Sequence, residues 1–433
     1  MSQAQIDTLA ALFDDAVQTL KEGGVLPADW QNKSQITRTK DLSHGDFASN
    51  IAMTAAKAAK TNPRTLAEQI VNALPDNQDI RQVDIAGPGF INVFLNSDAK
   101  FAVLEDIFAL QDRFGLSEQY AGQKVQVEFV SANPTSSLHV GHGRGAAFGM
   151  SVSNLLEAVG YDVTREYYVN DAGRQMDILA TSTYLRYLEA NGESVTFPSN
   201  AYKGDYVRDI AEMVKTQHGN SYVHCFEQVA KDVAADAQYD ITANGDKELI
   251  SGDKEAHIDG LIANSKSLLG ANYELFLNAA LTGILADIKD DLNDFGVRYE
   301  RWFSERSITD EIEPALQILE DKGHLYEKDG NVWFKSTDFG DEKDRVVRRA
   351  NGQTTYFASD IAYHKNKFDR GFDKVIDVLG ADHHGYVPRV RAALLALGID
   401  AERLDVVLVQ FVALWRGSEK VPMSSRSGEF VTL

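Results

Sequence analysis

The sequence contains a single cysteine, Cys225, so the chain cannot form an internal disulfide bond or a cysteine-rich metal site. It also has no long apolar run, because the stretch from Val406 to Trp415 is interrupted by Gln410 and is too short to cross a bilayer. Its first residues show neither the basic nor the apolar region of a signal peptide. These absences together predict a cytoplasmic protein with no membrane partner.

Basic residues are scarce. The chain has 43 Lys and Arg against 64 Asp and Glu, for a formal net charge of −21. Nonspecific binding to nucleic acid depends on many basic contacts to phosphates, so this balance argues against a general nucleic-acid binder and against a DNA partner. An enzyme of this composition that does bind a nucleic acid must gather its basic residues on one face. Composition alone favours an acidic enzyme with no polynucleotide partner.

The chain has 433 residues, 44% of them hydrophobic and 25% charged, and no internal repeat or low-complexity segment. This length predicts two or three domains. Residues 1–112 have the pattern of a separate α+β domain. A helical stripe runs from Ile6 to Leu20, and Asn62-Pro63 is typical of a helix start. Two strands are expected at 82–86 and 90–95, joined by a glycine-rich turn.

The most informative stretch lies between residues 125 and 160. Val125–Val130 alternates as a strand does, a turn follows, and a helix is expected after Gly143. The loop carries His139 and His142 in a His-x-Gly-His pattern. The free N–H groups of a helix start form an anion site, which favours nucleotide binding. The alternatives for the two histidines are a metal pair or two solvated loop residues.

Further strands alternate with helices along the rest of the chain. Strands are expected at 161–168, 332–334, 374–379 and 406–414, and the residues from 181 to 289 are mostly helical and polar. This order predicts an α/β fold, a Rossmann-like doubly wound parallel sheet, with ligands at the carboxyl ends of the strands. The catalytic domain is expected over 113–180 and 290–433, with 181–289 as a helical insertion.

The His-x-Gly-His pattern, the stretch Glu128–Thr135 and the stretch Arg165–Gly173 together resemble class I aminoacyl-tRNA synthetases, and within them the arginine-specific family. Residues 44–50 and 87–92 resemble the domain that this family adds at its N-terminus. The resemblance implies an arginine–tRNA ligase that uses ATP with Mg²⁺, L-arginine and tRNA(Arg), works as a monomer and holds no structural metal.

The resemblance also implies site residues. It assigns catalytic roles to His139, His142, Ser424 and Arg426. It assigns ATP binding to Gly141, Gly143, Gly380, Asp382, His383 and Met423. Arginine binding falls on Glu128, Asn133, Tyr356, Asp360 and His384, with Asp360 as partner of the guanidinium. Contact with the tRNA falls on Phe90 and Asn92, which would stack on and hydrogen-bond an unpaired base.

Some of these residues have simpler interpretations when taken alone. Phe90 and Asn92 could be a core residue and a turn residue, and Asp382 with the following histidines could be a metal site. Glu128 could be an exposed strand residue and Asp360 a helix cap. The nearly continuous match of residues 344–384 to the arginine-specific pattern favours the substrate roles over these alternatives.

The chain departs from the family pattern in the loop that begins at Met423. Pro422 and Ser425 stand where the family usually has two lysines, and Ser136 stands where some members carry a compensating lysine. Either Lys420 or Arg426 could supply the missing cation. An inactive tRNA-binding paralogue and a small nucleotidyltransferase are the competing interpretations. The sequence stops soon after this loop, so the anticodon-binding domain of the family is expected to be absent.

Overall fold

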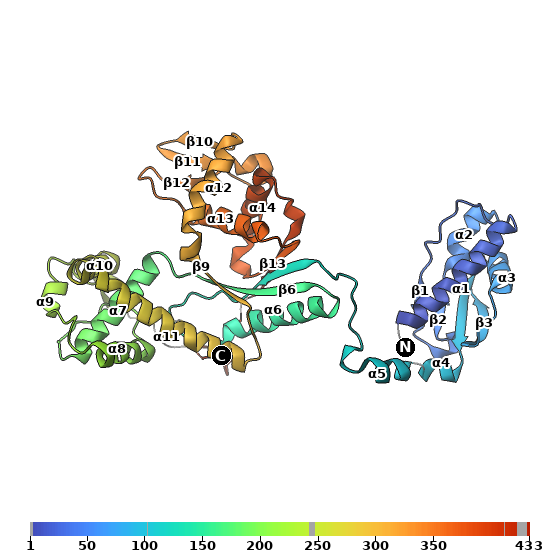
Figure 1. The fold of residues 1–433 in the computed structure, drawn as a ribbon, viewed down its shortest axis with the longest axis horizontal. Coiled ribbons are helices and arrows are strands. Elements are labelled where there is room, and N and C mark those ends of the chain that lie inside the picture. The colour runs from blue at the N-terminus through green and yellow to red at the C-terminus, as the bar shows by residue number, and fades with distance from the viewer. Residues whose placement is uncertain (1–2, 102, 242–246, 411, 422–430) are drawn as a thin grey trace. The chain divides into compact units, whose positions relative to one another are not determined.

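A computed structural model describes residues 3–101, 103–241, 247–410, 412–421 and 431–433. The chain divides into two compact units, Met1–Leu116 and Ser117–Leu433 (Figure 1). Each unit has its own hydrophobic core. Sequence patterning places the first boundary at residue 112, close to the end of the first unit.

The N-terminal unit packs helices on one antiparallel sheet with strand order β1-β2-β4-β3. Its core contains Phe13 from α1, Leu66 from α3 and Ile91 from β4. Its elements are α1 (Gln3–Glu22), β1 (Ile36–Arg38), β2 (Phe47–Ser49), α2 (Ile51–Ala59), α3 (Pro63–Ala73), β3 (Ile80–Ala86), β4 (Phe90–Leu95), α4 (Ser97–Phe101) and α5 (Val103–Leu110).

Local sequence signals account for the elements of this unit. The side chain of Asn62 accepts a hydrogen bond from the backbone N–H of Arg64 at the start of α3, which is the predicted cap. The turn between β3 and β4 needs Gly89, whose φ is +138° and whose added Cβ would lie 2.9 Å from the backbone of Pro63. The predicted α+β character of the unit agrees with its observed elements.

The second unit is built on a five-stranded sheet with the order β14-β13-β5-β6-β9, and every neighbouring pair is parallel. Its elements are β5 (Lys124–Glu128), α6 (Val140–Ala158), β6 (Asp162–Val169), α7 (Arg174–Ala190), α8 (Asp205–His218), α9 (Phe226–Val229), β7 (Gln238–Ile241), β8 (Lys247–Ser251), α10 (Lys254–Leu269), α11 (Tyr273–Asp294), β9 (Arg301–Ser304), α12 (Thr309–Asp321), β10 (Leu325–Lys328), β11 (Asn331–Phe334), β12 (Arg345–Arg348), α13 (Tyr356–Asp369), β13 (Lys374–Gly380), α14 (Tyr386–Leu397), β14 (Leu404–Val409), β15 (Trp415–Arg416) and β16 (Glu419–Lys420).

The strand order confirms the predicted Rossmann-like α/β fold. The first strand of the unit, β5, lies in the middle of the sheet, with β6 on one side and β13 on the other. The order therefore reverses between β5 and β13, where ligands of such sheets bind. One expected strand is corrected. The apolar run at 406–414 yields β14, which ends at Val409 and forms an edge of the sheet.

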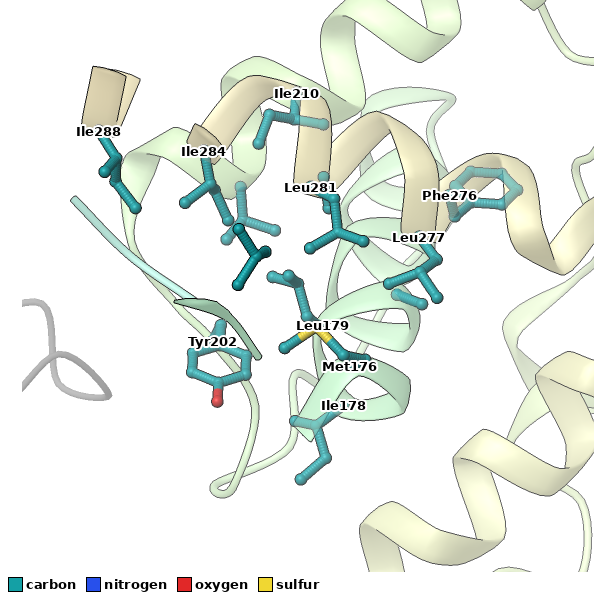
Figure 2. Close-up of a cluster of buried hydrophobic side chains, with 14 of the residues drawn as sticks. Met176, Ile178, Leu179, Tyr202, Ile210, Phe276, Leu277, Leu281, Ile284 and Ile288 are labelled. Carbon is teal, nitrogen blue, oxygen red and sulfur yellow. The ribbon is translucent and has the colours of Figure 1, made fainter. Parts of the chain in front are cut away.

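Helices α7, α8, α10 and α11 form a bundle that carries its own part of the core (Figure 1). Figure 2 shows apolar side chains that gather between α7, α8 and α11, among them Leu179, Ile210 and Leu281. The hairpin of β7 and β8 also lies between residues 181 and 289, and the sequence patterning missed it. The predicted limits of the insertion, 181–289, stay a prediction.

Of the described residues, one helical stretch, Lys254–Asp294, could span a membrane by its length and composition. Its apolar residues, such as Phe276 and Ile284, are buried against α7 and α8. Burial of these residues inside the protein accounts equally well for the apolar composition of this helical stretch.

Helices α12, α13 and α14 form a second group, which packs beside the antiparallel sheet β10-β11-β12 (Figure 1). Sequence patterning identified only β11 of this sheet. Helix α13 carries Tyr356 at its first position and Asp360 one turn later. It contributes buried residues such as Phe357 and Ile361 to a core shared with α12 and α14.

Candidate active site

Three cavities meet where the strand order reverses. The first, of about 390 Å³, includes Gly380 and His142 in its lining. The second, of about 560 Å³, shares both of these residues and extends toward α13. The third, of about 200 Å³, lies along residues 132–139 and also includes His142. His142 therefore lies at the junction of all three.

The backbone turns sharply at the carboxyl end of β5. Val130 and Ser131 have φ values of 67° and 43°, in the left-handed region that a β-branched residue rarely adopts. The Ser131 hydroxyl stabilises this turn because it donates to Glu128 Oε1 and accepts from the Tyr168 N–H, both at 3.0 Å. The predicted strand 125–130 is therefore too long, since β5 ends at Glu128.

The helix after this loop starts earlier than predicted. Helix α6 begins at Val140, so His139 is its N-cap and His142 lies in its first turn. The two imidazole rings stack with centroids 3.7 Å apart. The backbone N–H of His139 donates to His142 Nδ1 at 3.2 Å. A neutral His142 that accepts at Nδ1 carries its proton on Nε2, where it serves as a donor.

Both histidines are held in the neutral form. Burial lowers the pKa of His142 to about 4, and His139 adds to this shift by charge repulsion. Burial also lowers the pKa of His139. At neutral pH such a pair can offer an anion hydrogen bonds at the positive end of α6 but no imidazolium charge.

The residues predicted to bind ATP divide between several places. Gly141 and Gly380 line the cavity of about 390 Å³ together with the two histidines. An added Cβ on Gly380 would lie 2.6 Å from Oδ1 of the exposed Asp382 side chain, which could move aside. Gly143 lies outside the lining, and a Cβ there would meet Leu433 at 2.8 Å. Asp382 is exposed and lines none of the three cavities.

Four of the five residues predicted to bind arginine line the cavity of about 560 Å³, namely Glu128, Asn133, Tyr356 and Asp360. Asn133 Oδ1 accepts from Asn170 Nδ2 at 3.1 Å, which orients its amide. The fifth, His384, is exposed and absent from the lining. His383, which the resemblance assigned to ATP, lines this larger cavity instead.

Two carboxyl groups of this cavity have raised pKa values. Burial raises the pKa of Asp360 to about 6, a nearby Glu128 adds to the rise, and His364 and Arg389 oppose it. Burial raises the pKa of Glu305 to about 7, and Asp171 and Asp360 raise it further by repulsion. Glu305 Oε2 is buried and has no hydrogen-bond partner among the described residues. A cationic ligand would relieve both groups.

Sequence reasoning missed several residues that line the same cavity: Tyr168, Asn170, Glu305, Tyr363, His364, Asp377, Tyr386 and Arg389. A signal for some of them was present. Tyr356, Asp360, Tyr363 and Lys367 follow helical spacing on α13 and therefore share one face of it. Nothing local marks Glu305, which reaches the cavity through the packing of the segment after β9.

The remaining predicted residues lie elsewhere. Phe90 in the N-terminal unit is 41% exposed, whereas Asn92 in the same strand is 6% exposed. Met423, Ser424 and Arg426 lie outside the described residues, so their predicted roles stay predictions.

Comparison with known families decides the assignment. A family model for the arginyl-tRNA synthetase N-terminal domain matches residues 7–95. A second family model, for the class I tRNA synthetase (R) catalytic domain, matches residues 105–216 and 281–433. The chain belongs to the arginyl-tRNA synthetase family. The resemblance inferred from the sequence is thereby confirmed.

Individual relatives agree with this membership. The chain is 83% identical over 433 residues to an arginine–tRNA ligase of Psychrobacter arcticus, and it spans 71% of that protein. It is 63% identical over 427 residues, or 98% of the chain, to an arginine–tRNA ligase of Acinetobacter baumannii, and it spans 72% of that protein.

Solved structures also match. A Campylobacter jejuni protein described as an arginyl-tRNA synthetase aligns with a TM-score of 0.61 at 32% identity, over 76% of this chain and 63% of the other. An arginyl-tRNA synthetase of Thermus thermophilus aligns with a TM-score of 0.56 at 21% identity, over 93% of this chain and 65% of the other, and supports the fold.

Proposed function

We propose that this chain activates L-arginine with ATP and transfers it to the 3′-terminal ribose of tRNA(Arg). In the first step a carboxylate oxygen of arginine attacks the α-phosphorus, the bond to the bridging oxygen breaks, and pyrophosphate leaves. In the second step a ribose hydroxyl attacks the arginyl carbonyl and AMP leaves. Membership of the family and relatives named arginine–tRNA ligases support this function over a nucleotidyltransferase or a non-catalytic paralogue.

The two histidines are proposed to bind the phosphates of ATP. His142 Nε2–H and the free N–H groups at the start of α6 are donors beside the cavity of about 390 Å³. Donors placed before the reaction stabilise charge that develops on phosphoryl oxygens without reorganising. Gly141 and Gly380 allow the nucleotide to lie against the backbone.

The cavity of about 560 Å³ is proposed to bind arginine. Asp360 and Glu305 would pair with the guanidinium, whose planar fork suits carboxylates. Glu128 would hold the α-ammonium and Asn133 the carboxylate. Tyr356 would cover the side chain. This orientation brings the arginine carboxylate toward His142, which lines both cavities, so that both substrates meet in line.

The other partners follow from the same proposal. Among the described residues, no group of three or more His, Cys, Asp or Glu side chains could hold a metal ion. We therefore expect Mg²⁺ to enter on the phosphates of ATP. Phe90 is proposed to stack on a tRNA base, whereas the Asn92 contact stays a prediction. Ser424, Arg426 and Met423 are proposed to act on ATP, and the cytoplasm is the proposed location.

One observation carries the assignment of arginine to this cavity, namely two desolvated carboxyl groups with raised pKa values facing one space. The test is calorimetry on Asp360→Asn. We expect a weaker Kd for arginine by about 10- to 100-fold with an unchanged Kd for ATP. Asp382→Asn is the matched control, since Asp382 is exposed and outside the cavity. Equal arginine affinity in both variants would contradict the assignment.

A further inference from the structure

Three buried carboxylates lie side by side on three neighbouring strands, at the level where β5 ends. Asp377 of β13 pairs in register with Glu128 of β5, and Glu128 pairs with Glu166 of β6. Their residues are 2%, 6% and 0% exposed, respectively. Adjacent buried charges of the same sign are costly unless cations and hydrogen bonds compensate them. We refer to Asp377, Glu128 and Glu166 as the acidic row.

Helix α13 supplies this compensation. Lys367 Nζ lies 2.6 Å from Glu128 Oε2 and 2.7 Å from Asp377 Oδ1. Arg370 Nη2 donates to Glu166 Oε1 at 3.0 Å. The Tyr363 hydroxyl lies 2.7 Å from both Glu128 Oε2 and Glu166 Oε1. Helix α13 and its C-cap residue Arg370 therefore join three neighbouring strands through their acidic side chains.

The two oxygens of Glu128 differ in their surroundings. Oε2 is held by Lys367 and Tyr363. Among the described residues, Oε1 receives only the Ser131 hydroxyl, at 3.0 Å, and Glu128 lines the cavity of about 560 Å³. A carboxylate oxygen has room for a further donor. Oε1 can therefore accept a hydrogen bond from a ligand.

The free capacity of Oε1 indicates what that ligand carries. Lys367, Arg370 and, at 3.5 Å from Glu166, Arg301 of β9 all pair with the acidic row, and His364 Nε2 lies 2.9 Å from Asp377 Oδ2. Lys367 and Tyr363 bind Glu128 through Oε2, so Oε1 keeps room for a donor. An ammonium group is the donor that a carboxylate oxygen binds most strongly, by a charge-assisted hydrogen bond. L-arginine has such a group at its α-carbon.

We propose that Lys367 is a positioning residue that holds Glu128 Oε2 and thereby directs Oε1 at the α-ammonium of arginine. This inference rests on the proposed role of Glu128 in arginine binding. Lys367 has no exposed surface, so it acts through Glu128 and does not touch the substrate. Without it, Oε2 keeps the hydrogen bond from Tyr363 alone among the described residues, so the orientation of Glu128 is less strictly fixed and its preference for an ammonium falls.

The test compares L-arginine with 5-guanidinopentanoic acid, which lacks the α-amino group, by calorimetry on the whole chain. The unsubstituted protein is expected to prefer arginine by about 10- to 100-fold. In Lys367→Met, which keeps the length of the side chain and removes its charge, we expect this preference to fall below about threefold. Affinity for the analogue should change little, because its guanidinium site is intact. Lys367→Arg should restore the preference.

Other outcomes would overturn the inference. If Lys367 has a purely structural role, Lys367→Met should raise the Kd of both ligands by the same factor. If Lys367 instead competes with the α-ammonium for Glu128, Lys367→Met should strengthen the preference for arginine. If Lys367→Met does not fold, the charge-balanced double variant Lys367→Met/Asp377→Asn carries the same comparison. Glu128→Gln separates this inference from the proposed function. If Glu128→Gln keeps the preference, the assignment of Glu128 fails and this inference fails with it. If only Lys367→Met keeps the preference, this inference alone fails.

Discussion

Asp360 and Glu305 are acids that the protein keeps partly protonated near neutral pH. Their pKa values of about 6 and about 7 result first from burial and then from repulsion by neighbouring carboxylates. The guanidinium of arginine stays charged at any pH in this range. Arginine bound as proposed would therefore compete with protons for the same two carboxyl groups.

We predict that arginine binding weakens as pH falls. From pH 8 to pH 5.5 the carboxyl groups of Asp360 and Glu305 gain protons, so the Kd for arginine should rise by about 10- to 100-fold. Glu305→Gln should flatten the part of the profile near pH 7. Calorimetry in buffers of different ionisation enthalpy should also detect proton release on binding. An arginine affinity independent of pH would contradict the placement of these two groups at the guanidinium.

His142 gives a prediction about the chemical step. His142→Ala should lower the rate of arginine-dependent AMP formation by about 100- to 1000-fold, the cost of one lost donor to developing charge. Because the pKa of His142 is about 4, its contribution should stay constant between pH 6 and pH 8. Arginine affinity should hardly change. His218→Ala in α8 is a control outside the cavities, and equal rates in both variants would exclude the phosphate role.

Helix α6 must lie very close to the sheet to carry its histidines. A Cβ on Gly149 would lie 2.1 Å from Phe129 Cγ, whereas a Cβ on Gly145 would meet nothing within 4 Å. Gly149→Ala should therefore lower the free energy of unfolding by about 1–3 kcal/mol. Gly145→Ala, one turn away, should leave it unchanged or raise it by up to about 1 kcal/mol. Chemical denaturation of both variants without ATP tests this, and equal stability would show that the helix can shift.

Helix α13 serves two purposes with one face. Tyr356 and Asp360 at its start face the arginine cavity, and Lys367 near its end neutralises the acidic row. The same ion pairs that hold α13 on the sheet therefore also fix the residues proposed to bind the substrate. Apolar contacts alone would fix the position of the helix relative to the sheet less strictly, because such contacts are non-directional.

At the scale of the whole molecule, the chain has two units with separate cores. The proposed tRNA contact lies in the first unit and the arginine cavity in the second. Because the two units have separate cores, a substitution in one should leave the packing of the other unchanged.

Phe90→Ala should weaken tRNA binding by about 1–3 kcal/mol, the contribution of one stacked base, and leave arginine affinity unchanged. Phe108→Ala is the matched control, because Phe108 is a more exposed phenylalanine on α5 of the same unit. Filter binding at fixed salt gives the comparison, since the affinity of a tRNA for an acidic protein depends on ionic strength. Equal tRNA affinity in the two variants would exclude stacking on Phe90.

Short-range patterns in the sequence determined much of this fold. Asn62 before Pro63 predicted a helix start, and the apolar run at 374–379 predicted β13, because caps and periodicity act over a few residues. The His-x-Gly-His loop between a strand and a helix predicted the anion site for the same reason. The predicted start of α6 was wrong by about one turn, because His139 caps the helix and α6 begins at Val140 rather than after Gly143.

Only the tertiary structure determined the neighbours of each charge. Glu128, Glu166 and Asp377 are far apart in the sequence, and the parallel pairing of β13, β5 and β6 brings them into one row, where Lys367 pairs with two of them. Glu305 reaches the arginine cavity in the same way. Burial and charge interactions depend on distances in space. The raised pKa values of the cavity and the role of Lys367 are therefore properties of the folded chain, although every residue involved is visible in the sequence.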